Sequence, residues 1–391
     1  MTASVADIQP FVNRDRLFAR LRSLVQLPSE NPPGNEAAVA RLAAEMCEEM
    51  GLDTSLHEGA PNRPSIVARW TGSDGPTVSY CSHIDVIPAG DHQLWSVDPF
   101  GAEIRDGVMH GRGACDAKGP VAAALEAVAA LRDAGFDPAG TLELQLVADE
   151  EAMGFKGTGY LVDRGIVSPD FAVVGEPTSL RVVRAQRGAC WARITTRGVA
   201  GHGSAPERGV NAIRHMAEII LRLEEALPDI THPVLGGPSI GVGTISGGAK
   251  VNVVPASCVA EIDRRSLPSE TQEDVIRSIE GAVDLASKRF PEIEAKVECA
   301  FYAPPFEVAE NSPLVLRCRE AVTETTGKAA QIMGFRGASD ARFLAEAGAD
   351  VVVMGPGDIS LAHTARESVE LEEVYRAGIA YALVFAGLLG G

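Results

Sequence analysis

The hydrophobic and polar positions of the chain alternate between strand-like and helix-like spacing. Apolar runs rich in Val and Leu, typical of strands that helices cover on both faces, occupy residues 141–148, 170–175 and 350–355. Residues 77–83 are rich in β-forming residues, and residues 36–50 and 120–134 repeat apolar residues with helical spacing. We therefore predict an α/β fold with a mostly parallel sheet and helices on both of its faces.

Residues at the ends of the two predicted helices favour the same interpretation. Asn35 is placed to cap the first helix and Gly51 to end it. Pro120 suits the first turn of the second helix, and Gly135 follows its last apolar residue. Each helix therefore has a start and a stop signal.

The pattern changes between about residues 183 and 302. The expected elements are a strand at 191–199, a helix at 211–227, strands at 239–250 and 256–264, a helix at 270–288 and a strand at 294–302. The order β-α-β-β-α-β is that of a ferredoxin-like α+β unit. We predict that residues 183–302 are inserted into a larger domain made of residues 1–182 and 303–391.

Length, composition and charge restrict the class of protein. A chain of 391 residues exceeds the roughly 250–300 residues at which single hydrophobic cores stop growing, so two domains are expected. The 46% hydrophobic and 23% charged residues are typical of a soluble globular protein. The net charge of −18, from 35 Lys and Arg against 53 Asp and Glu, disfavours nucleic acid and membranes as partners.

Cysteine usage and the N-terminal segment bear on the compartment. The seven cysteines are scattered and form no C-x-x-C pair, which is typical of free thiols in a reducing compartment. The N-terminus has neither the basic nor the apolar region of a signal peptide, and no stretch approaches the 18 or so apolar residues of a membrane span. We expect a cytoplasmic protein.

Metal-binding residue types recur at the ends of the predicted strands or in the loops that follow them. They are His83, Asp116, Glu150, Glu151, Glu176 and His363. Open α/β sheets bind ligands at this edge, and zinc takes imidazole nitrogen and carboxylate oxygen in a roughly tetrahedral shell. A helix cap, a solvated charge or a core histidine explains any single one, but not the recurrence. A metal-dependent hydrolase is therefore the leading hypothesis.

Some of these segments suggest roles from their residues alone. Asp85, two residues after His83, is placed to hold the imidazole ring and raise its basicity. Asp116 lies in a glycine-flanked turn before a helix, where a short carboxylate can bridge two cations. Of the adjacent Glu150 and Glu151, one can bind metal while the other moves protons to and from a metal-activated water.

Ten motifs in a fixed order make the chain resemble a known family. They are SHIDVIP, WSVDPF, GRGACDAKG, ADEE, GEPT, GHGSAPERGVNAI, GGAKVNVVP, EIDRRSLP, GASDARFLAEAGA and GPGDISLAHTARE. From about residue 14 to 385 the chain resembles the co-catalytic di-zinc aminoacylase and carboxypeptidase family, which includes acetylornithine deacetylase and succinyl-diaminopimelate desuccinylase. The resemblance implies a di-zinc exopeptidase-like catalytic domain, with residues 183–302 as a lid and dimerisation domain.

The resemblance also implies a ligand set for two zinc ions per subunit, for which cobalt can substitute. His83 and Glu176 would hold one ion, and Glu151 and His363 would hold the other. Asp116 would bridge both ions.

The catalytic roles that the resemblance implies follow the same motifs. Glu150 would be the general base, and Asp85 would orient His83. A hydroxide bridging the two metals would attack an amide carbonyl, after which Glu150 would protonate the leaving amine. A non-proline cis peptide bond is implied between Asp116 and Ala117.

The inserted domain carries three further candidates. By resemblance, His202 would reach the active site of the partner subunit and stabilise the oxyanion, which implies a homodimer. Asn252 and Arg265 would hold substrate oxygens, and the arginine fork suits an α-carboxylate. The alternative, purely structural roles are a turn histidine for His202, a loop-closing asparagine for Asn252 and a surface arginine for Arg265.

Two positions depart from the family pattern. Family members commonly carry Met after the bridging Asp and Ser after the loop His, whereas this chain has Ala117 and Gly203. Neither change removes a ligand. Both affect the pocket shape, and hence the substrate, more than the reaction class.

The expected function is removal of an N-acyl group, of acetyl or succinyl type, from an amino acid. A carboxypeptidase or dipeptidase activity of the same di-zinc family is the alternative, with an N-acyl amino acid or a dipeptide as the small-molecule partner. A serine hydrolase is a weaker rival, because Gly237–Gly241 formally matches G-x-S-x-G but leads into a predicted strand rather than a strand-to-helix elbow. A non-catalytic dimerisation module is the last alternative.

Overall fold

The computed structural model describes residues 4–390 of the chain. These residues form two compact units. Unit 1 contains the described residues up to Arg184, Val308–Met333 and those from Ser339 onward, and unit 2 contains Ala185–Glu307 and Gly334–Ala338. The predicted insertion covers residues 183–302. The short segment Gly334–Ala338, which returns to unit 2 late in the chain, has no counterpart in that prediction.

Unit 1 is built on a mixed sheet whose centre is parallel. The strands lie in the order β1 (Asp53–Ala60), β2 (Arg63–Thr71), β6 (Ala139–Val147), β3 (Ser73–His83), β7 (Phe171–Val174), β15 (Asp350–Val353) and β8 (Val182–Gln186). The neighbours β6, β3, β7 and β15 are parallel, whereas β1, β2 and β8 pair antiparallel. The short strands β13 (Phe306–Glu307) and β14 (Ile332–Phe335) also pair with β8, and β13 together with the last two residues of β8 belongs to unit 2. The predicted α/β fold is confirmed.

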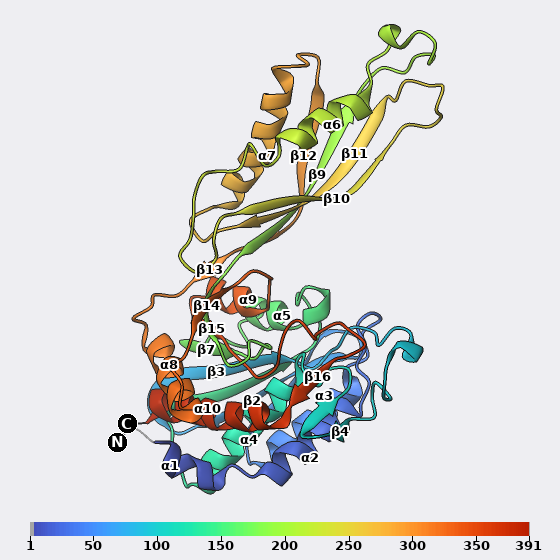
Figure 1. Ribbon diagram of the computed structural model, residues 1–391. Helices are drawn as coiled ribbons and strands as arrows, with labels where there is room; N and C mark the ends of the chain where they lie inside the picture. Colours follow the sequence, from blue (N-terminus) through green and yellow to red (C-terminus); the bar gives the residue numbers. More distant parts are fainter. Residues whose placement is uncertain (1–3, 391) are drawn as a thin grey trace. The chain divides into compact units, whose positions relative to one another are not determined.

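Helices cover both faces of this sheet (Figure 1). The unit 1 helices are α1 (Val5–Ile8), α2 (Arg14–Val25), α3 (Ala37–Glu49), α4 (Lys118–Asp133), α5 (Thr158–Asp163), α8 (Pro313–Thr326), α9 (Ala341–Glu346) and α10 (Leu371–Leu389). The helices α4 and α10 pack on β3 from one side, and α9 packs on β15 from the other. Because α4 lies between the sheet, α2 and α10, it is apolar almost all round and buried along nearly its whole length.

The predicted helix at 36–50 is confirmed as α3, but its expected cap is wrong. The N-cap residue is Glu36, not Asn35, and Glu36 makes no capping hydrogen bond. Its carboxylate instead pairs with the buried guanidinium of Arg63. The predicted helix at 120–134 is confirmed as α4, which starts at Lys118 and places Pro120 in its first turn.

A small antiparallel sheet stands beside the main one in unit 1. Its strand order is β16 (Ser368–Glu370), β5 (Val108–His110) and β4 (Glu103–Arg105). Ser368 pairs with His110, and Glu370 pairs with Val108. This pairing joins two segments that are far apart in the sequence, one leading to Asp116 and the other following His363.

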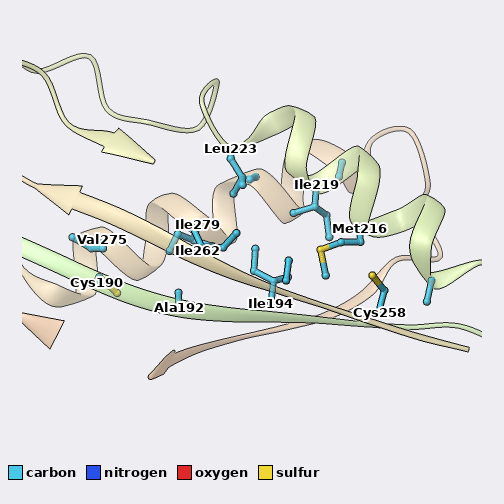
Figure 2. Close-up of a cluster of buried hydrophobic side chains, with 14 residues drawn as sticks. Cys190, Ala192, Ile194, Met216, Ile219, Leu223, Cys258, Ile262, Val275 and Ile279 are labelled. Atoms are coloured by element: carbon cyan, nitrogen blue, oxygen red, sulfur yellow. The ribbon is translucent and has the colours of Figure 1, made fainter. Parts of the chain in front are cut away.

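Unit 2 has the β-α-β-β-α-β order that the sequence predicts. Its elements are β9 (Gly188–Arg197), α6 (Ala212–Arg222), β10 (Ser239–Gly247), β11 (Ser257–Ser266), α7 (Gln272–Ser287) and β12 (Glu294–Ala303). The sheet is antiparallel in the order β10-β11-β9-β12, with β10 at an edge. Alternate residues of β9 and β11 point to the two helices and form an apolar core with them, as Figure 2 shows.

No helix within residues 4–390 combines the length and the apolar character that crossing a membrane requires.

Candidate metal centre

The ends of neighbouring parallel strands in unit 1 gather four of the six candidate site residues. His83 is the last residue of β3, Glu150 and Glu151 follow β6 in a short 3-10 turn, and Glu176 follows β7. Since β6, β3 and β7 are parallel neighbours, their C-terminal ends share one edge of the sheet.

Asp116 and His363 reach the same place from loops next to the small sheet. Asp116 lies between β5 and α4, and His363 lies between β15 and β16. The peptide bond between Asp116 and Ala117 is cis, as the resemblance implies. His363 has a φ of 63°, which is uncommon for a residue other than glycine.

The two oxygens of the Asp116 carboxylate face two different imidazoles. Oδ1 lies 3.0 Å from Nε2 of His83, and Oδ2 lies 3.4 Å from Nε2 of His363. Nε2 of His363 also lies 3.0 Å from Oε2 of Glu151. One ligand atom each from His83, Asp116 and Glu151 lies within 4.8 Å of the others. A carboxylate with one oxygen toward each histidine has the arrangement that a ligand bridging two cations requires.

Glu176 extends the cluster on the His83 side. Its Oε1 lies 3.9 Å from Nε2 of His83, and this buried oxygen has no hydrogen-bond partner within the described chain. A buried carboxylate oxygen without a donor is costly unless a cation or a proton satisfies it. The donor set of imidazole nitrogen and carboxylate oxygen therefore fits divalent cations of the zinc type.

The two histidines respond to the surrounding carboxylates. Burial alone would lower the pKa of His83, but its contacts with Asp116 and Asp85 outweigh burial and raise the pKa well above its ordinary value. The contacts with Asp116 and Glu151 raise the pKa of His363 to about 10, although its side chain is 52% exposed. In the metal-free protein both imidazoles therefore favour the protonated form.

The carboxylates themselves divide into two groups. Burial raises the pKa of Glu150, Glu151 and Glu176, and their negative neighbours raise it further. Burial would also raise the pKa of Asp116, but its contacts with His363 and His83 hold it below the ordinary value. The four carboxylates of the cluster thus outnumber its two histidines. Bound cations would neutralise the remaining negative charge.

Asp85 contacts His83 through its backbone carbonyl more closely than through its carboxylate. The proton donor Nδ1 of His83 lies 2.9 Å from the backbone carbonyl of Asp85, whereas the Asp85 carboxylate is 3.6 Å away. The carbonyl can only accept, so Nδ1 carries the proton and Nε2 is left for a metal. The Asp85 carboxylate instead accepts the backbone N–H groups of Glu150 and Glu151, at 3.3 and 3.2 Å.

The Glu150 side chain differs from the other carboxylates of the cluster, each of which lies within 4.0 Å of a histidine nitrogen. Within residues 4–390 its carboxylate forms no hydrogen bond or ion pair, and its negative neighbours are Glu176, Asp340 and Glu151. The Asp85 carboxylate accepts the backbone N–H of Glu150, and the preceding residue Asp149, which has a φ of 75°, binds Arg63 at 2.6 Å.

Several residues that support the site were not identified from the sequence. Asn31 donates to the Asp85 carboxylate at 2.8 Å, and Glu367 accepts N–H groups from the loop that carries Asp116. Asp340, whose pKa burial raises to about 6, binds Thr158 at 2.7 Å. The motifs GASDARFLAEAGA and GPGDISLAHTARE contain Asp340 and Glu367, and these motifs were the available signal. The other contacts join segments too distant in the sequence for spacing to indicate them.

The candidates of the inserted domain lie in unit 2. His202 and Asn252 come together there, because Gly203 donates its N–H to the Asn252 carbonyl at 2.8 Å. A Cβ atom at Gly203 would lie 2.9 Å from that carbonyl oxygen, so a glycine permits this close approach. Arg265 lies on β11, where it forms an ion pair with Asp263 at 2.9 Å.

The ring of His202 has a defined tautomer. Its Nδ1 accepts the backbone N–H of Ser204 at 3.2 Å and lies 2.7 Å from the Ser204 hydroxyl. When Nδ1 accepts, the neutral ring carries its proton on Nε2. The exposed ring therefore offers an N–H donor to a partner outside its own loop.

The geometry does not support the serine-hydrolase alternative. Ser239 is the first residue of β10, an edge strand, and pairs across the sheet with Arg265. Its hydroxyl accepts from Arg187 at 3.3 Å. The G-x-S-x-G motif requires its serine at a strand-to-helix elbow, whereas Ser239 begins an edge strand.

Fold and site together define the class of protein, an α/β metallohydrolase with its metal site at the C-terminal edge of a mainly parallel sheet. The chain belongs to the peptidase family M20/M25/M40, whose model matches residues 80–386. It is accordingly a metal-dependent hydrolase of amide bonds.

Named relatives cover most of the chain. It is 29% identical over 379 residues to a succinyl-diaminopimelate desuccinylase of Hahella chejuensis, covering 94% of this chain and 95% of that enzyme. It is 32% identical over 327 residues to an acetylornithine deacetylase of Myxococcus xanthus, covering 82% of each.

Solved structures share the fold at lower identity. An aminopeptidase PepT of Bacillus cereus superposes with a TM-score of 0.81 at 22% identity, covering 97% of this chain and 99% of that one. A dinuclear metal-binding peptidase of Bacillus subtilis gives a TM-score of 0.74 at 16% identity, with the same coverage. These likenesses confirm the predicted fold class.

Proposed function

We propose that the protein removes an N-acyl group, of the acetyl or succinyl type, from an amino acid. The observation that carries this proposal is the Asp116 carboxylate with one oxygen toward His83 and the other toward His363. The two relatives named as a desuccinylase and a deacetylase support the choice of N-acyl amino acids as the substrate class.

The proposed cofactor is a pair of zinc ions per subunit, replaceable by cobalt. His83 and Glu176 would hold one ion, Glu151 and His363 the other, and Asp116 both. The unpartnered buried oxygen of Glu176 and the short contact between Glu151 and His363 support this division. When bound, the cations activate water and polarise the amide carbonyl.

Glu150 is the proposed general base. It accepts a proton from the attacking water and delivers it to the nitrogen of the leaving amino acid. Burial and the Glu176 carboxylate raise the pKa of Glu150, which brings a carboxyl group closer to the pH at which it can both take and return a proton. The Asp85 carboxylate supports this role by holding the Glu150 backbone.

His202 is the proposed oxyanion donor, acting in the active site of the partner subunit of a homodimer. Its Nε2–H donor suits the negative oxygen that forms when water attacks an amide carbon. The edge strand β10, which has exposed Val242 and Ile245, supports a second copy of the chain as the partner.

Asn252 and Arg265 are the proposed contacts to substrate oxygens. The pairing of the His202 and Asn252 segments supports a joint role for these two residues. The guanidinium of Arg265 suits the α-carboxylate of an amino acid, and Asp263 holds it in place until substrate binds.

A cytoplasmic location remains a proposal supported by the cysteines. All seven are free, and six of them are buried. Free thiols are typical of a reducing compartment.

A substrate panel tests the function. The purified chain would be assayed for amine release from N-acetyl and N-succinyl amino acids and from dipeptides, with zinc or cobalt, with chelator, and with a serine-directed reagent. We expect release from N-acyl amino acids that chelator abolishes, that added metal restores and that the serine reagent leaves unchanged. Faster cleavage of dipeptides would favour the carboxypeptidase or dipeptidase alternative. A metal-loaded chain that releases no amine from any substrate would contradict the proposal.

A further inference from the structure

A single buried carboxylate accepts several backbone hydrogen bonds from the loop that carries Asp116. Oε1 of Glu367 accepts the N–H groups of Gly113, Cys115 and Asp116 at 2.9, 3.2 and 3.1 Å. Its other oxygen pairs with the guanidinium of Arg112 in the same loop. Glu367 is 1% exposed, so these contacts are made away from water.

Glu367 also belongs to the segment that carries His363. It lies four residues after His363, and its N–H donates to the carbonyl of Thr364 at 3.4 Å. Its own carbonyl accepts the N–H of Gly111 at 3.1 Å, directly beyond the pairing of β16 with β5. One residue therefore joins the loop of Asp116 to the loop of His363 through both its backbone and its side chain.

Each of the two loops carries one candidate ligand, and the ligand atoms of these two residues lie close together. Oδ2 of Asp116 lies 3.4 Å from Nε2 of His363. The backbone of Asp116 is held by Glu367, and His363 has a backbone conformation that few side chains adopt freely. A shift of either loop would change the separation of these two ligand atoms.

We propose that Glu367, with Arg112 as its counter-ion, is a positioning residue that sets Asp116 and His363 at the spacing one of the two cations requires. This inference rests on the proposed di-metal function and adds a residue to it. Glu367 is not one of the proposed metal ligands. It acts through the loop backbone, as outer residues of metal sites do when they fix the geometry of ligands.

The chemistry of the contact explains why a carboxylate is needed. One carboxylate oxygen can accept several N–H groups at once, whereas the second oxygen meets the Arg112 guanidinium. In Glu367→Gln the amide would turn its NH₂ group either to the loop N–H donors or to Arg112. Either choice places donors against donors, so the loop would move although the side chain keeps its size.

The experiment measures metal binding rather than turnover. Metal-free wild type, Glu367→Gln and Glu126→Gln would be titrated with zinc against a chromophoric chelator, and the absorption spectrum of each cobalt form would be recorded. Glu126 is a matched control, since its carboxylate is fully buried and accepts from Asn13 N–H and from Arg16, but contacts no ligand loop.

We expect Glu367→Gln to bind one of the two zinc ions about 10–100-fold more weakly and to change the cobalt spectrum. Glu126→Gln should lower the melting temperature while leaving both affinities and the spectrum unchanged. If Glu367→Gln fails to fold, Arg112→Lys replaces it, and a several-fold weakening of the same ion is expected.

Two results overturn the inference in different ways. Wild-type affinities and an unchanged spectrum in the folded Glu367→Gln chain, or in Arg112→Lys in its place, would make Glu367 a structural residue only, with the proposed function intact. A wild-type chain that binds fewer than two cations would remove the proposed function itself, and the inference with it.

Discussion

The two units bury charged side chains in different ways. In unit 2 the fully buried Arg264 has its partner Glu270 at 2.5 Å, and the core beneath the sheet is apolar. In unit 1 the cluster around Asp116 brings Glu150, Glu151 and Glu176 together, and burial with mutual repulsion raises the pKa of each. Buried charge that the protein leaves uncompensated marks the place where something else must bind.

This contrast assigns different tasks to the two units. Unit 1 holds the proposed metal ligands and the base on loops anchored to a buried sheet. Unit 2 resembles an ordinary α+β scaffold that presents His202 and Asn252 from loops. Substitutions in unit 1 should therefore change the chemistry, and substitutions in the core of unit 2 should change stability.

The largest effect is expected from Glu150→Gln. Removing the base should lower kcat by about 10²–10⁴-fold, with metal content unchanged. The adjacent Glu151→Gln is the matched comparison, because it removes a proposed ligand and should weaken metal binding. Turnover and metal content of both variants are measured together. A Glu150→Gln rate within a few-fold of wild type would show that another group moves the proton.

Unit 2 should contribute to chemistry through His202. His202→Ala removes the proposed oxyanion donor and should lower kcat by about 10²–10³-fold, with both metals retained. Ser204→Ala keeps the backbone N–H that sets the His202 tautomer, so it should lower kcat much less than His202→Ala does. Steady-state kinetics on the best N-acyl substrate compare the two. If both variants lowered kcat by the same small factor, His202 would have no part in the catalytic step.

The core of unit 2 should affect stability without affecting the metal site. Ile194, on β9, is fully buried among the side chains in Figure 2. Ile194→Ala should lower the free energy of unfolding by about 2–5 kcal/mol. Thr195→Ala, on the opposite face of the strand, is the control and should have a small effect. Chemical denaturation measures the free energy of unfolding of both variants. An altered zinc affinity in Ile194→Ala would show that the core of unit 2 also affects the metal site.

A smaller effect concerns pH and His363. Its pKa is raised from 6.5 to about 10 by Asp116 and Glu151. The resulting stabilisation of metal-free protein is full below about pH 6.5 and is lost as the pH rises through 10. His363→Gln removes it, so the wild type should melt higher than the variant at pH 6, and the difference should shrink by pH 10. Because the side chain is half exposed, the difference should be small.

Zinc supplies the control for the pH prediction. In the proposed site a bound cation would replace the proton of His363, so the stabilisation by zinc should grow as the pH rises. Melting curves with and without chelator at each pH measure this. A wild-type advantage over His363→Gln that is constant with pH would contradict the raised pKa.

The sequence predicts those features that depend on local pattern. The parallel strands and the ligands at their ends follow from apolar runs that stop at His83, Glu150 and Glu176, because parallel strands align their C-terminal ends. The missed contacts depend on tertiary structure. Glu367 and Asp116 are 251 residues apart. Asn35 does not cap α3, because the N-cap position falls on Glu36, whose carboxylate pairs with Arg63. Such contacts have no signature in spacing.

The central claim is that Asp116 bridges two divalent cations. Counting the zinc or cobalt bound per chain, by elemental analysis after chelator treatment and reloading, tests it most directly in wild type and Asp116→Ala. We predict two ions per wild-type chain, and in Asp116→Ala the loss of tight binding of at least one, with amide hydrolysis lost. A wild-type chain with at most one ion, or an Asp116→Ala chain that still holds two tightly, would contradict the account.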